Sequence, residues 1–189
     1  MGALFQHKMT VDDYLAWVEH QPGRYELYAG SVYAMAPERA IHAEMKFAVQ
    51  TALAEAIRKA GLPCYMLPDG MTVRVDRDTA HEPDALVYCG PKLPKAAVEV
   101  PNPVIVVEVL SPSTRHIDAS AKLGGYGSIQ SIRHYLIFDP DGPPTLHHER
   151  TGADTFVTKV VRSGALHLDP PGLDVDLDPL HALTEDRRD

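Results

Sequence analysis

One short segment constrains the fold more than any other: the aliphatic residues 104–107, which are followed at once by Glu108. A nearly continuous β-branched run is typical of a central strand covered on both faces. An ionised carboxylate inside such a strand costs several kcal/mol of folding free energy unless a cation or a donor meets it. We therefore expect a central strand over 104–110 and a partner for Glu108.

The length and composition favour one folded domain. The chain has 189 residues, of which 44% are hydrophobic and 23% charged, which excludes disordered, collagen-like and coiled-coil classes. The longest aliphatic run falls far short of the roughly 18 residues that a spanning helix needs. The N-terminus shows no secretory pattern, so we expect a cytoplasmic protein of one domain over 1–189, with no membrane partner. Two cysteines, Cys64 and Cys89, are too few for a disulfide framework or a zinc site, and we expect both to be reduced.

The charge balance restricts the partners. Eighteen basic residues stand against 26 acidic ones, a net charge of −8. This balance argues against a general electrostatic surface for nucleic acid. A phosphate-containing partner would need a local basic patch or a bound metal ion.

Apolar periodicity and turn residues predict a mixed α/β sheet flanked by helices, with an N-terminal hairpin and a β-rich C-terminal part. Helices are expected over 10–18, 41–60 and 117–129, although three glycines weaken the last one. A hairpin over 24–35 turns at Ala29-Gly30. Further strands are expected over 64–67, 71–75, 84–88, 104–110, 135–138, 145–148, 156–161, 165–168 and 173–177.

A second carboxylate, Asp84, opens the strand-like segment 83–88. Two carboxylates from adjacent strands are a usual beginning of a Mg²⁺ site. A structural reading stays open for each residue: Glu108 at an exposed strand end or in a salt bridge, and Asp84 as a turn residue before a strand.

Pro83-Asp84 followed 24 residues later by Glu108 resembles the core of the PD-(D/E)XK nuclease superfamily. The surrounding sequence is similar to the Uma-two family, described as "putative restriction endonucleases". The similar segments are RYEL (24–27), His42 at the start of a long helix, EPDALV (82–87), VVEVLSPSTR (106–115), KL (122–123) and YLIFDP (135–140). The resemblance covers about 9–180 and leaves a short acidic tail over 181–189.

This resemblance implies a restriction-endonuclease-like fold and a Mg²⁺ (or Mn²⁺) site that hydrolyses DNA phosphodiester bonds. Asp84, Glu108 and the backbone carbonyl of Val109 would be the metal ligands, and Glu26 matches the family's N-terminal acidic position. A homodimer is also implied. The chemistry agrees, because a hard divalent ion takes carboxylate and carbonyl oxygens and lowers the pKa of a bound water.

The sequence departs from the full motif, which would place lysine two residues after Glu108, where Leu110 stands. The charge that stabilises the phosphate in the transition state must then come from elsewhere. Lys122 is the candidate, since it matches a lysine that the family carries on the following helix, and Tyr126 lies one turn later. A solvated surface lysine is the alternative, and glycines 124, 125 and 127 interrupt that helix.

Other polar residues are weaker candidates for contacts with substrate. His42 and Lys46 share a helix face, Ser111 and Arg115 follow the central strand, and Tyr126 lies one turn after Lys122. Capping, turn and packing roles explain the histidine and the serine equally well.

Three functions stay open at this level. The first is a Mg²⁺-dependent DNA endonuclease that uses Glu26, Asp84, Glu108 and Lys122. The second is an inactive binding or assembly module with a nuclease fold, favoured by Leu110 and the net charge. The third is a metal-dependent hydrolase of a small phosphoester, which also fits an acidic surface.

Overall fold

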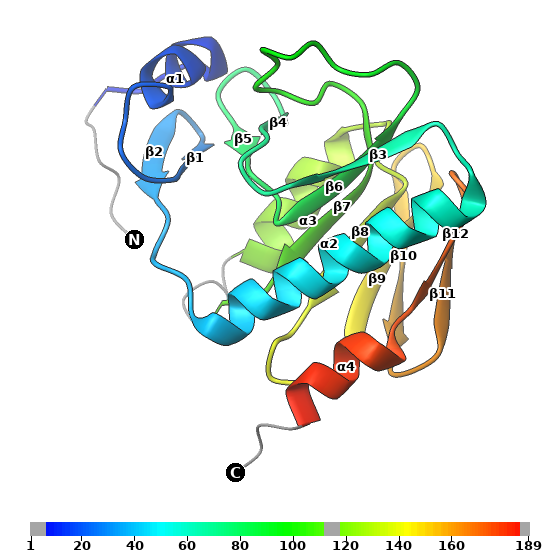
Figure 1. The fold of residues 1–189 in the computed structure, drawn as a ribbon. Coiled ribbons are helices and arrows are strands. Elements are labelled where there is room, and N and C mark those ends of the chain that lie inside the picture. The colour runs from blue at the N-terminus through cyan, green and yellow to red at the C-terminus, as the bar shows by residue number, and fades with distance from the viewer. Residues whose placement is uncertain (1–6, 112–117, 186–189) are drawn as a thin grey trace.

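The computed structural model describes residues 7–111 and 118–185 (Figure 1). Its centre is a six-stranded mixed sheet in the order β10-β9-β8-β7-β6-β3. β7 and β8 are parallel, and the other neighbours are antiparallel. The strands are β3 (Cys64–Pro68), β6 (Ala85–Cys89), β7 (Pro103–Val109), β8 (His134–Phe138), β9 (Thr145–Gly152) and β10 (Thr155–Val161).

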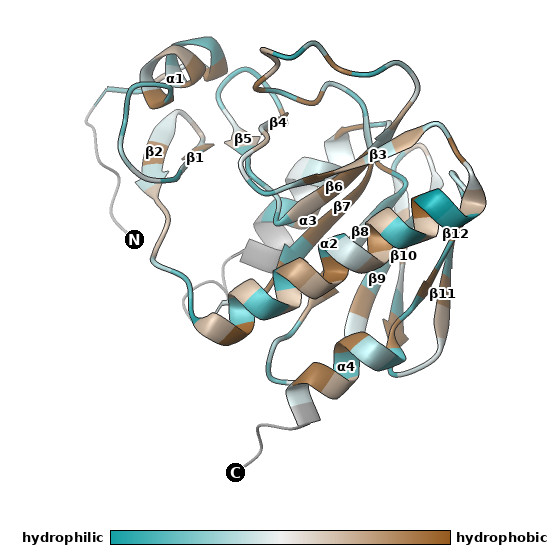
Figure 2. Cartoon of the chain, in the orientation of Figure 1, coloured by the Kyte–Doolittle hydropathy of each residue, from teal (hydrophilic) through white to brown (hydrophobic). Residues whose placement is uncertain are grey.

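Helices cover both faces of this sheet (Figure 1). α2 (Ala40–Ala60) packs its apolar side against one face, and the alternating brown and teal bands in Figure 2 show its amphipathic pattern. α3 (Asp118–Ser128) lies on the opposite face. The C-terminal ribbon of β11 (Ala165–Leu168) and β12 (Leu173–Asp176), with α4 (Asp178–Glu185), completes the core beside α2.

A second, four-stranded sheet in the order β2-β1-β5-β4 contains the N-terminal hairpin. Its members are β1 (Tyr25–Tyr28), β2 (Ser31–Ala34), β4 (Val73–Arg74) and β5 (Ala80–His81). The hairpin turns at Ala29 (φ 47°) and Gly30 (φ 76°), the two left-handed residues that a tight hairpin turn requires. α1 (Val11–Val18) packs against this sheet and begins at Thr10, whose side chain accepts from the backbone of Asp13.

The mixed sheet flanked by helices is confirmed, and the central strand contains Glu108 as expected. α3 forms in spite of its glycines, although the expected start at residue 117 lies outside the described part of the chain. Residues 181–185 of the expected C-terminal tail are helical, since they belong to α4. Leu180 and His181 of this helix are buried, because its apolar side closes the core beside α2.

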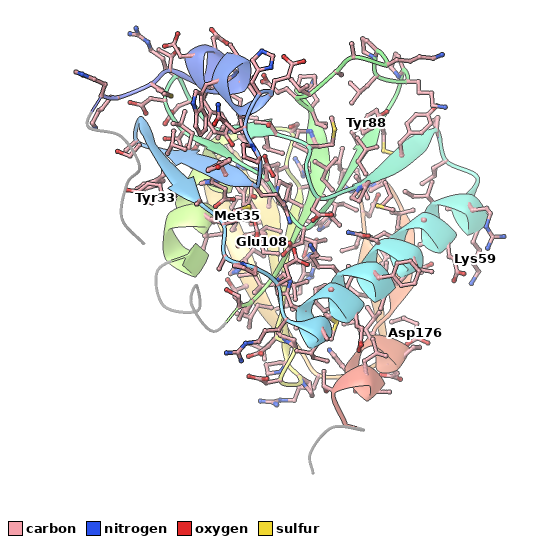
Figure 3. The ribbon with its side chains drawn as sticks, turned by 60° about the vertical axis from the view of Figure 1, so that its left-hand side comes forward. Tyr33, Met35, Lys59, Tyr88, Glu108 and Asp176 are labelled. Atoms are coloured by element: carbon pink, nitrogen blue, oxygen red, sulfur yellow. A yellow bond between two sulfur atoms is a disulfide. The ribbon has the colours of Figure 1, made fainter. Side chains whose placement is uncertain are left out.

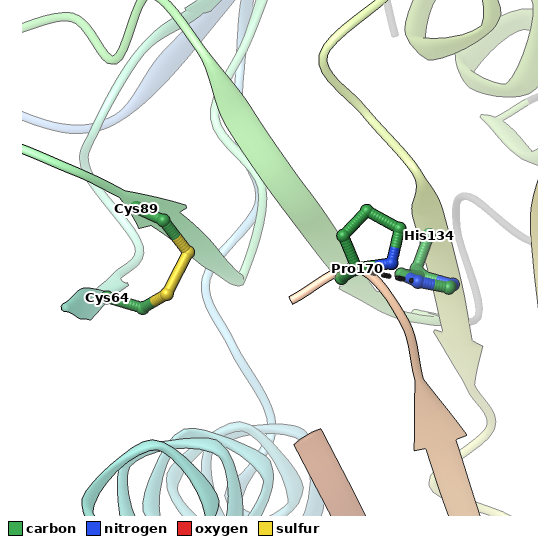
Figure 4. Close-up of a disulfide and its surroundings, with 4 residues drawn as sticks. All are labelled: Cys64, Cys89, His134 and Pro170. Atoms are coloured by element: carbon green, nitrogen blue, oxygen red, sulfur yellow. Dashed lines mark hydrogen bonds between the residues drawn. A yellow bond between two sulfur atoms is a disulfide. The ribbon is translucent and has the colours of Figure 1, made fainter. Parts of the chain in front are cut away.

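The prediction of two reduced cysteines is wrong, because Cys64 and Cys89 form a disulfide (Figure 4). They are 25 residues apart in sequence, but β3 and β6 pair so that these two residues stand directly opposite each other. Opposed residues on antiparallel strands have their β-carbons within reach of a disulfide. Only the pairing of the two strands brings the sulfurs together.

Reducing this disulfide is expected to lower the free energy of unfolding by about 3 kcal/mol, since it closes a loop of this size in the unfolded chain. Urea unfolding with and without dithiothreitol measures the effect. The double variant Cys64→Ser/Cys89→Ser is the control and should not respond to the reductant. An unchanged unfolding midpoint for fully reduced wild-type protein would contradict the expectation.

Buried histidines of β8 and β9 have structural contacts. His134 pairs with His147 at 2.9 Å and contacts the carbonyl oxygen of Pro170 at 3.0 Å, the bond drawn in Figure 4. Burial lowers the pKa of His147 to about 4. His148 contacts Thr158 instead, so the two neighbouring histidines do not share a site, as expected for adjacent residues of a strand.

Candidate functional site

Asp84 and Glu108 meet where β6 begins and β7 ends. The two strands are antiparallel, which places the first residue before β6 beside the last residues of β7. Asp84 Oδ2 accepts a hydrogen bond of 2.7 Å from the backbone N–H of Val109, and the backbone N–H of Asp84 donates to Val107. Gln50 of α2 donates to the carbonyl oxygen of Asp84. The backbone of the sheet therefore fixes the position of this carboxylate.

Glu108 has the partner that its place in a covered strand requires. The side chains of β7 alternate, so that Val106 and Glu108 face α3 while Val107 and Val109 face α2. Glu108 Oε1 accepts from Lys122 Nζ at 3.0 Å and from the hydroxyl of Tyr126 at 2.7 Å. The label for Glu108 in Figure 3 lies between the N-terminal hairpin and the first turns of α2.

Glu26 joins the same cluster from the second sheet. Its Oε1 accepts from Lys122 Nζ at 3.0 Å and from the backbone N–H of Glu82 at 3.2 Å. Lys122 is only 6% exposed and bridges two carboxylates that come from different sheets. The structure therefore brings Glu26, Glu108 and Lys122 together, with Asp84 on the neighbouring strand, and the solvated-lysine alternative does not hold.

The glycines of α3 allow this helix to approach closely. A β-carbon on Gly125 would lie 3.2 Å from His81 Nε2 and 3.3 Å from Val75. Glycine at this position thus lets α3 pack against β5 and carry Lys122 and Tyr126 to Glu108. The glycine-rich composition, which weakens the helix on its own, serves the packing of the site.

On the α2 side, His42 and Lys46 approach Asp84. His42 Nε2 donates to the carbonyl oxygen of Val109 at 2.8 Å and lies 3.8 Å from Asp84 Oδ2. Lys46 Nζ lies 3.8 Å from Asp84 Oδ1 and contacts Glu38 and Asp69. The carbonyl that the family resemblance assigns to a metal ion therefore has a histidine as its partner in this structure.

The cluster carries more negative charge than its cations balance. Burial raises the pKa of Glu108 to about 8; Lys122 opposes this shift, and the charges of Asp84 and Glu26 add to it. Burial also raises the pKa of Asp84, against the opposing effects of the Val109 N–H, His42 and Lys46. Burial also acts to raise the pKa of Glu26, but the charges of Lys122 and His81 outweigh it, and the pKa of Glu26 is lowered. A further cation at this cluster would be favourable.

The side chains present fit a divalent metal ion. Glu38, His42 and Asp84 each offer a ligand atom, and these atoms lie within 4.8 Å of one another. Carboxylate and carbonyl oxygens are the ligands that Mg²⁺ prefers, and an imidazole nitrogen suits Mn²⁺ as well. A cation here would also favour the charged form of Asp84, whose pKa burial raises. Both the donor set and the electrostatics therefore favour a metal centre at Asp84.

Two predicted substrate contacts, Ser111 and Arg115, follow β7 in the sequence. Ser111 is half-buried just beyond β7, and Arg115 lies outside the described residues.

Two other residues were missed by sequence reasoning. His81 is buried 4.0 Å from Glu26 Oε1, and neither ring nitrogen has a hydrogen-bond partner among the described residues. Arg24 forms ion pairs with Asp69 and Glu82. The sequence offered one indication for each residue. His81 is close in sequence to Pro83-Asp84, and strand alternation puts Arg24 on the same face as Glu26.

The mixed sheet, its flanking helices and the acidic cluster at two adjacent strand ends define a restriction-endonuclease-like α/β protein. The chain belongs to the Uma2 (Uma-two) family, described as "Putative restriction endonuclease", whose model matches residues 11–179. It is 26% identical over 176 residues to the uncharacterized protein slr1290 of Synechocystis sp., covering 92% of each chain.

The fold is similar to the crystal structure of "a putative nuclease belonging to DUF820" from Anabaena variabilis. The TM-score is 0.71 at 13% identity, over 93% of this chain and 99% of that one. In the described part of the chain, no helix has the length and apolar character needed to span a membrane.

Proposed function

We propose that this protein is a Mg²⁺- or Mn²⁺-dependent endonuclease that hydrolyses phosphodiester bonds of DNA. The observation that carries the proposal is the convergence of Asp84, Glu108 and Lys122 at the adjoining ends of two central strands. Two comparisons support the reading: membership of a family described as "Putative restriction endonuclease", and a fold similar to that of "a putative nuclease".

In this proposal, Asp84, Glu108 and the carbonyl of Val109 would hold the metal ion. Glu38 and His42, which also offer ligand atoms near Asp84, would not be among its ligands. When bound, the ion lowers the pKa of a water and offsets charge on the phosphate. Lys122, which sits against Glu108, supplies the positive charge that the motif usually places at position 110. Glu26 acts as a positioning residue, because it holds the ammonium group of Lys122 from the other side.

The remaining candidates have lesser roles. Tyr126 is fully buried and its hydroxyl donates to Glu108, so we assign it to orienting that carboxylate rather than to contact with substrate. His42, Ser111 and Arg115 are proposed to contact the DNA. A homodimer would supply two copies of the site, one for each strand of a duplex.

Calorimetric titration of Mg²⁺ and Mn²⁺ into wild-type protein and Asp84→Asn tests the proposal, followed by incubation of the same samples with supercoiled DNA. We expect wild-type protein to bind metal and nick DNA, and the variant to lose about 100-fold in metal affinity and its nicking activity. Asp174→Asn removes an exposed carboxylate of β12 and serves as the control.

Other outcomes favour the alternatives. If the protein binds metal and hydrolyses small phosphoesters but does not nick DNA, the function is that of a phosphoester hydrolase and not of an endonuclease. Absence of metal binding would leave the carboxylates as structural groups and would support a binding or assembly module.

A further inference from the structure

Two cations, Arg24 and Lys46, share carboxylate partners, and Lys46 lies next to Asp84. Arg24 precedes β1, and Lys46 lies on the second turn of α2 with its Nζ 3.8 Å from Asp84 Oδ1. The side chain of Lys46 is only 7% exposed, whereas that of Arg24 is 31% exposed. A buried ammonium group is costly to desolvate unless anions contact it. The identity of those anions is therefore informative.

Two carboxylate oxygens bridge this pair of cations. Asp69 Oδ2 lies 2.6 Å from Arg24 Nη1 and 2.7 Å from Lys46 Nζ. Glu38 Oε1 lies 3.0 Å from the same Arg24 nitrogen and also contacts Lys46 Nζ. Two oxygens thus each contact both a guanidinium and an ammonium group. Two oxygens of one phosphate group can make the same set of contacts, because arginine and lysine are the usual ligands of phosphate.

The two carboxylates lie on the solvent side of the cluster and on connecting segments. Glu38 is in the segment between β2 and α2, and Asp69 is in the turn after β3. Their side chains are 30% and 26% exposed, so both are accessible to solvent while Lys46 lies beneath them. Residues on such connections move at a lower energetic cost than those of the sheet.

Arg24 also has donor capacity that the protein does not use. Its Nε and Nη2 are buried and have no hydrogen-bond partner among the described residues, and Glu82 lies 3.6 Å from Nε. A guanidinium group that makes hydrogen bonds through only one of its three nitrogens can accept a further anion.

We propose that Arg24 and Lys46 form a subsite for a backbone phosphate of DNA beside Asp84, and that Glu38 and Asp69 occupy this subsite in the free protein. The inference rests on the proposed function for its choice of ligand. The incoming phosphate displaces the two carboxylates, which turn outward on their connecting segments. Their departure removes two negative charges from around Arg24 and Lys46 and leaves Glu82 and Asp84 as the nearby carboxylates. The local charge becomes more positive by two, which favours a DNA phosphate on an acidic protein.

The test measures binding of a short fluorescein-labelled DNA duplex by anisotropy in EDTA, where neither cleavage nor metal binding contributes. Glu38→Gln and Asp69→Asn are each expected to tighten binding by about threefold to tenfold, because the cations lose a competing anion. Arg24→Gln and Lys46→Gln are expected to weaken it about tenfold and to reduce the slope of log affinity against log salt by about 1 each.

Glu55→Gln is the matched control, because it removes the same charge from an exposed position of α2. If Glu38→Gln and Asp69→Asn bind DNA no more tightly than Glu55→Gln, the subsite is not occupied by these carboxylates and the proposal is overturned. The same conclusion follows if Arg24→Gln, shown to be folded by thermal unfolding, binds DNA with wild-type affinity and salt dependence.

Competition and cleavage distinguish the possible ligands and the two proposals. Inorganic phosphate that displaces the duplex at low concentration, with no tightening in the two acidic variants, would overturn the DNA ligand in favour of a small phosphoester. Tightened binding by Glu38→Gln with no cleavage in Mg²⁺ by any form of the protein would support the subsite while rejecting the proposed endonuclease activity.

Discussion

Replacing Lys122 by methionine is expected to lower the rate of DNA cleavage by about 10²–10³-fold, the usual cost of removing one charged donor from a transition-state site. The effect follows from the position of Nζ, which contacts both Glu26 and Glu108 at 3.0 Å. Methionine keeps the length of the side chain but leaves the two carboxylates without a shared cation. Cleavage of supercoiled DNA at saturating Mg²⁺ measures the rate.

Two variants control this prediction. Lys159→Met removes an exposed lysine of β10 that pairs with Glu149, and it should cleave DNA at the wild-type rate. Lys122→Arg keeps the charge and should retain part of the activity. A folded Lys122→Met protein that cleaves DNA at the wild-type rate would remove Lys122 from the site and leave its ion pairs as structure.

The largest expected effect on stability belongs to Arg150, and Arg150→Met should reduce the free energy of unfolding by about 3–5 kcal/mol. Arg150 is 3% exposed, and its guanidinium donates to four backbone carbonyl oxygens, those of Gly127, Ile129, Ile132 and Ala153. It also stacks on Phe156 at 4.4 Å. Methionine fills similar space but removes the guanidinium donor from the carbonyls of Gly127 and Ile132, which is the costly case. The carbonyls of Ile129 and Ala153 keep a second donor each, the backbone N–H of Ile132 and the side chain of Gln130.

Urea unfolding measures this prediction, and Arg162→Met, an exposed arginine just after β10, is the control that should change stability by less than about 0.5 kcal/mol. Arg150→Lys should fall between the two, since one ammonium group cannot reach all four carbonyls. Equal unfolding midpoints for Arg150→Met and wild-type protein would show that water replaces the guanidinium at no cost.

The order of elements and the carboxylates of the candidate site follow from local patterns. The β-branched run before Glu108, the period of α2 and the Ala29-Gly30 turn each act within a few residues, and the structure confirms them. That Glu108 must have a partner also follows from the local sequence, because the β-branched run predicts a buried strand around it. The family resemblance singled out Lys122 as the charge that faces the phosphate, and the structure shows that it is also the partner of Glu108.

What local patterns could not provide depends on pairings across long distances. Cys64 and Cys89 meet only because β3 pairs with β6. Arg24 reaches Asp69 only because the hairpin and the turn after β3 lie side by side. The use of Gly125 as a close contact with His81 requires α3 to be docked on β5. None of these neighbours is close in sequence, so no periodicity or motif could reveal them.

The short connection between the two sheets has a mechanical consequence. Residues 82–84 are all that separates β5, in the sheet of the N-terminal hairpin, from β6, in the central sheet. Glu26 belongs to the first sheet, and Asp84 is anchored to the second through the backbone of Val107 and Val109. A small rotation of one sheet against the other therefore changes the spacing of the carboxylates directly. A ligand that contacts both sheets would therefore fix the distance between Glu26 and Asp84 when it binds.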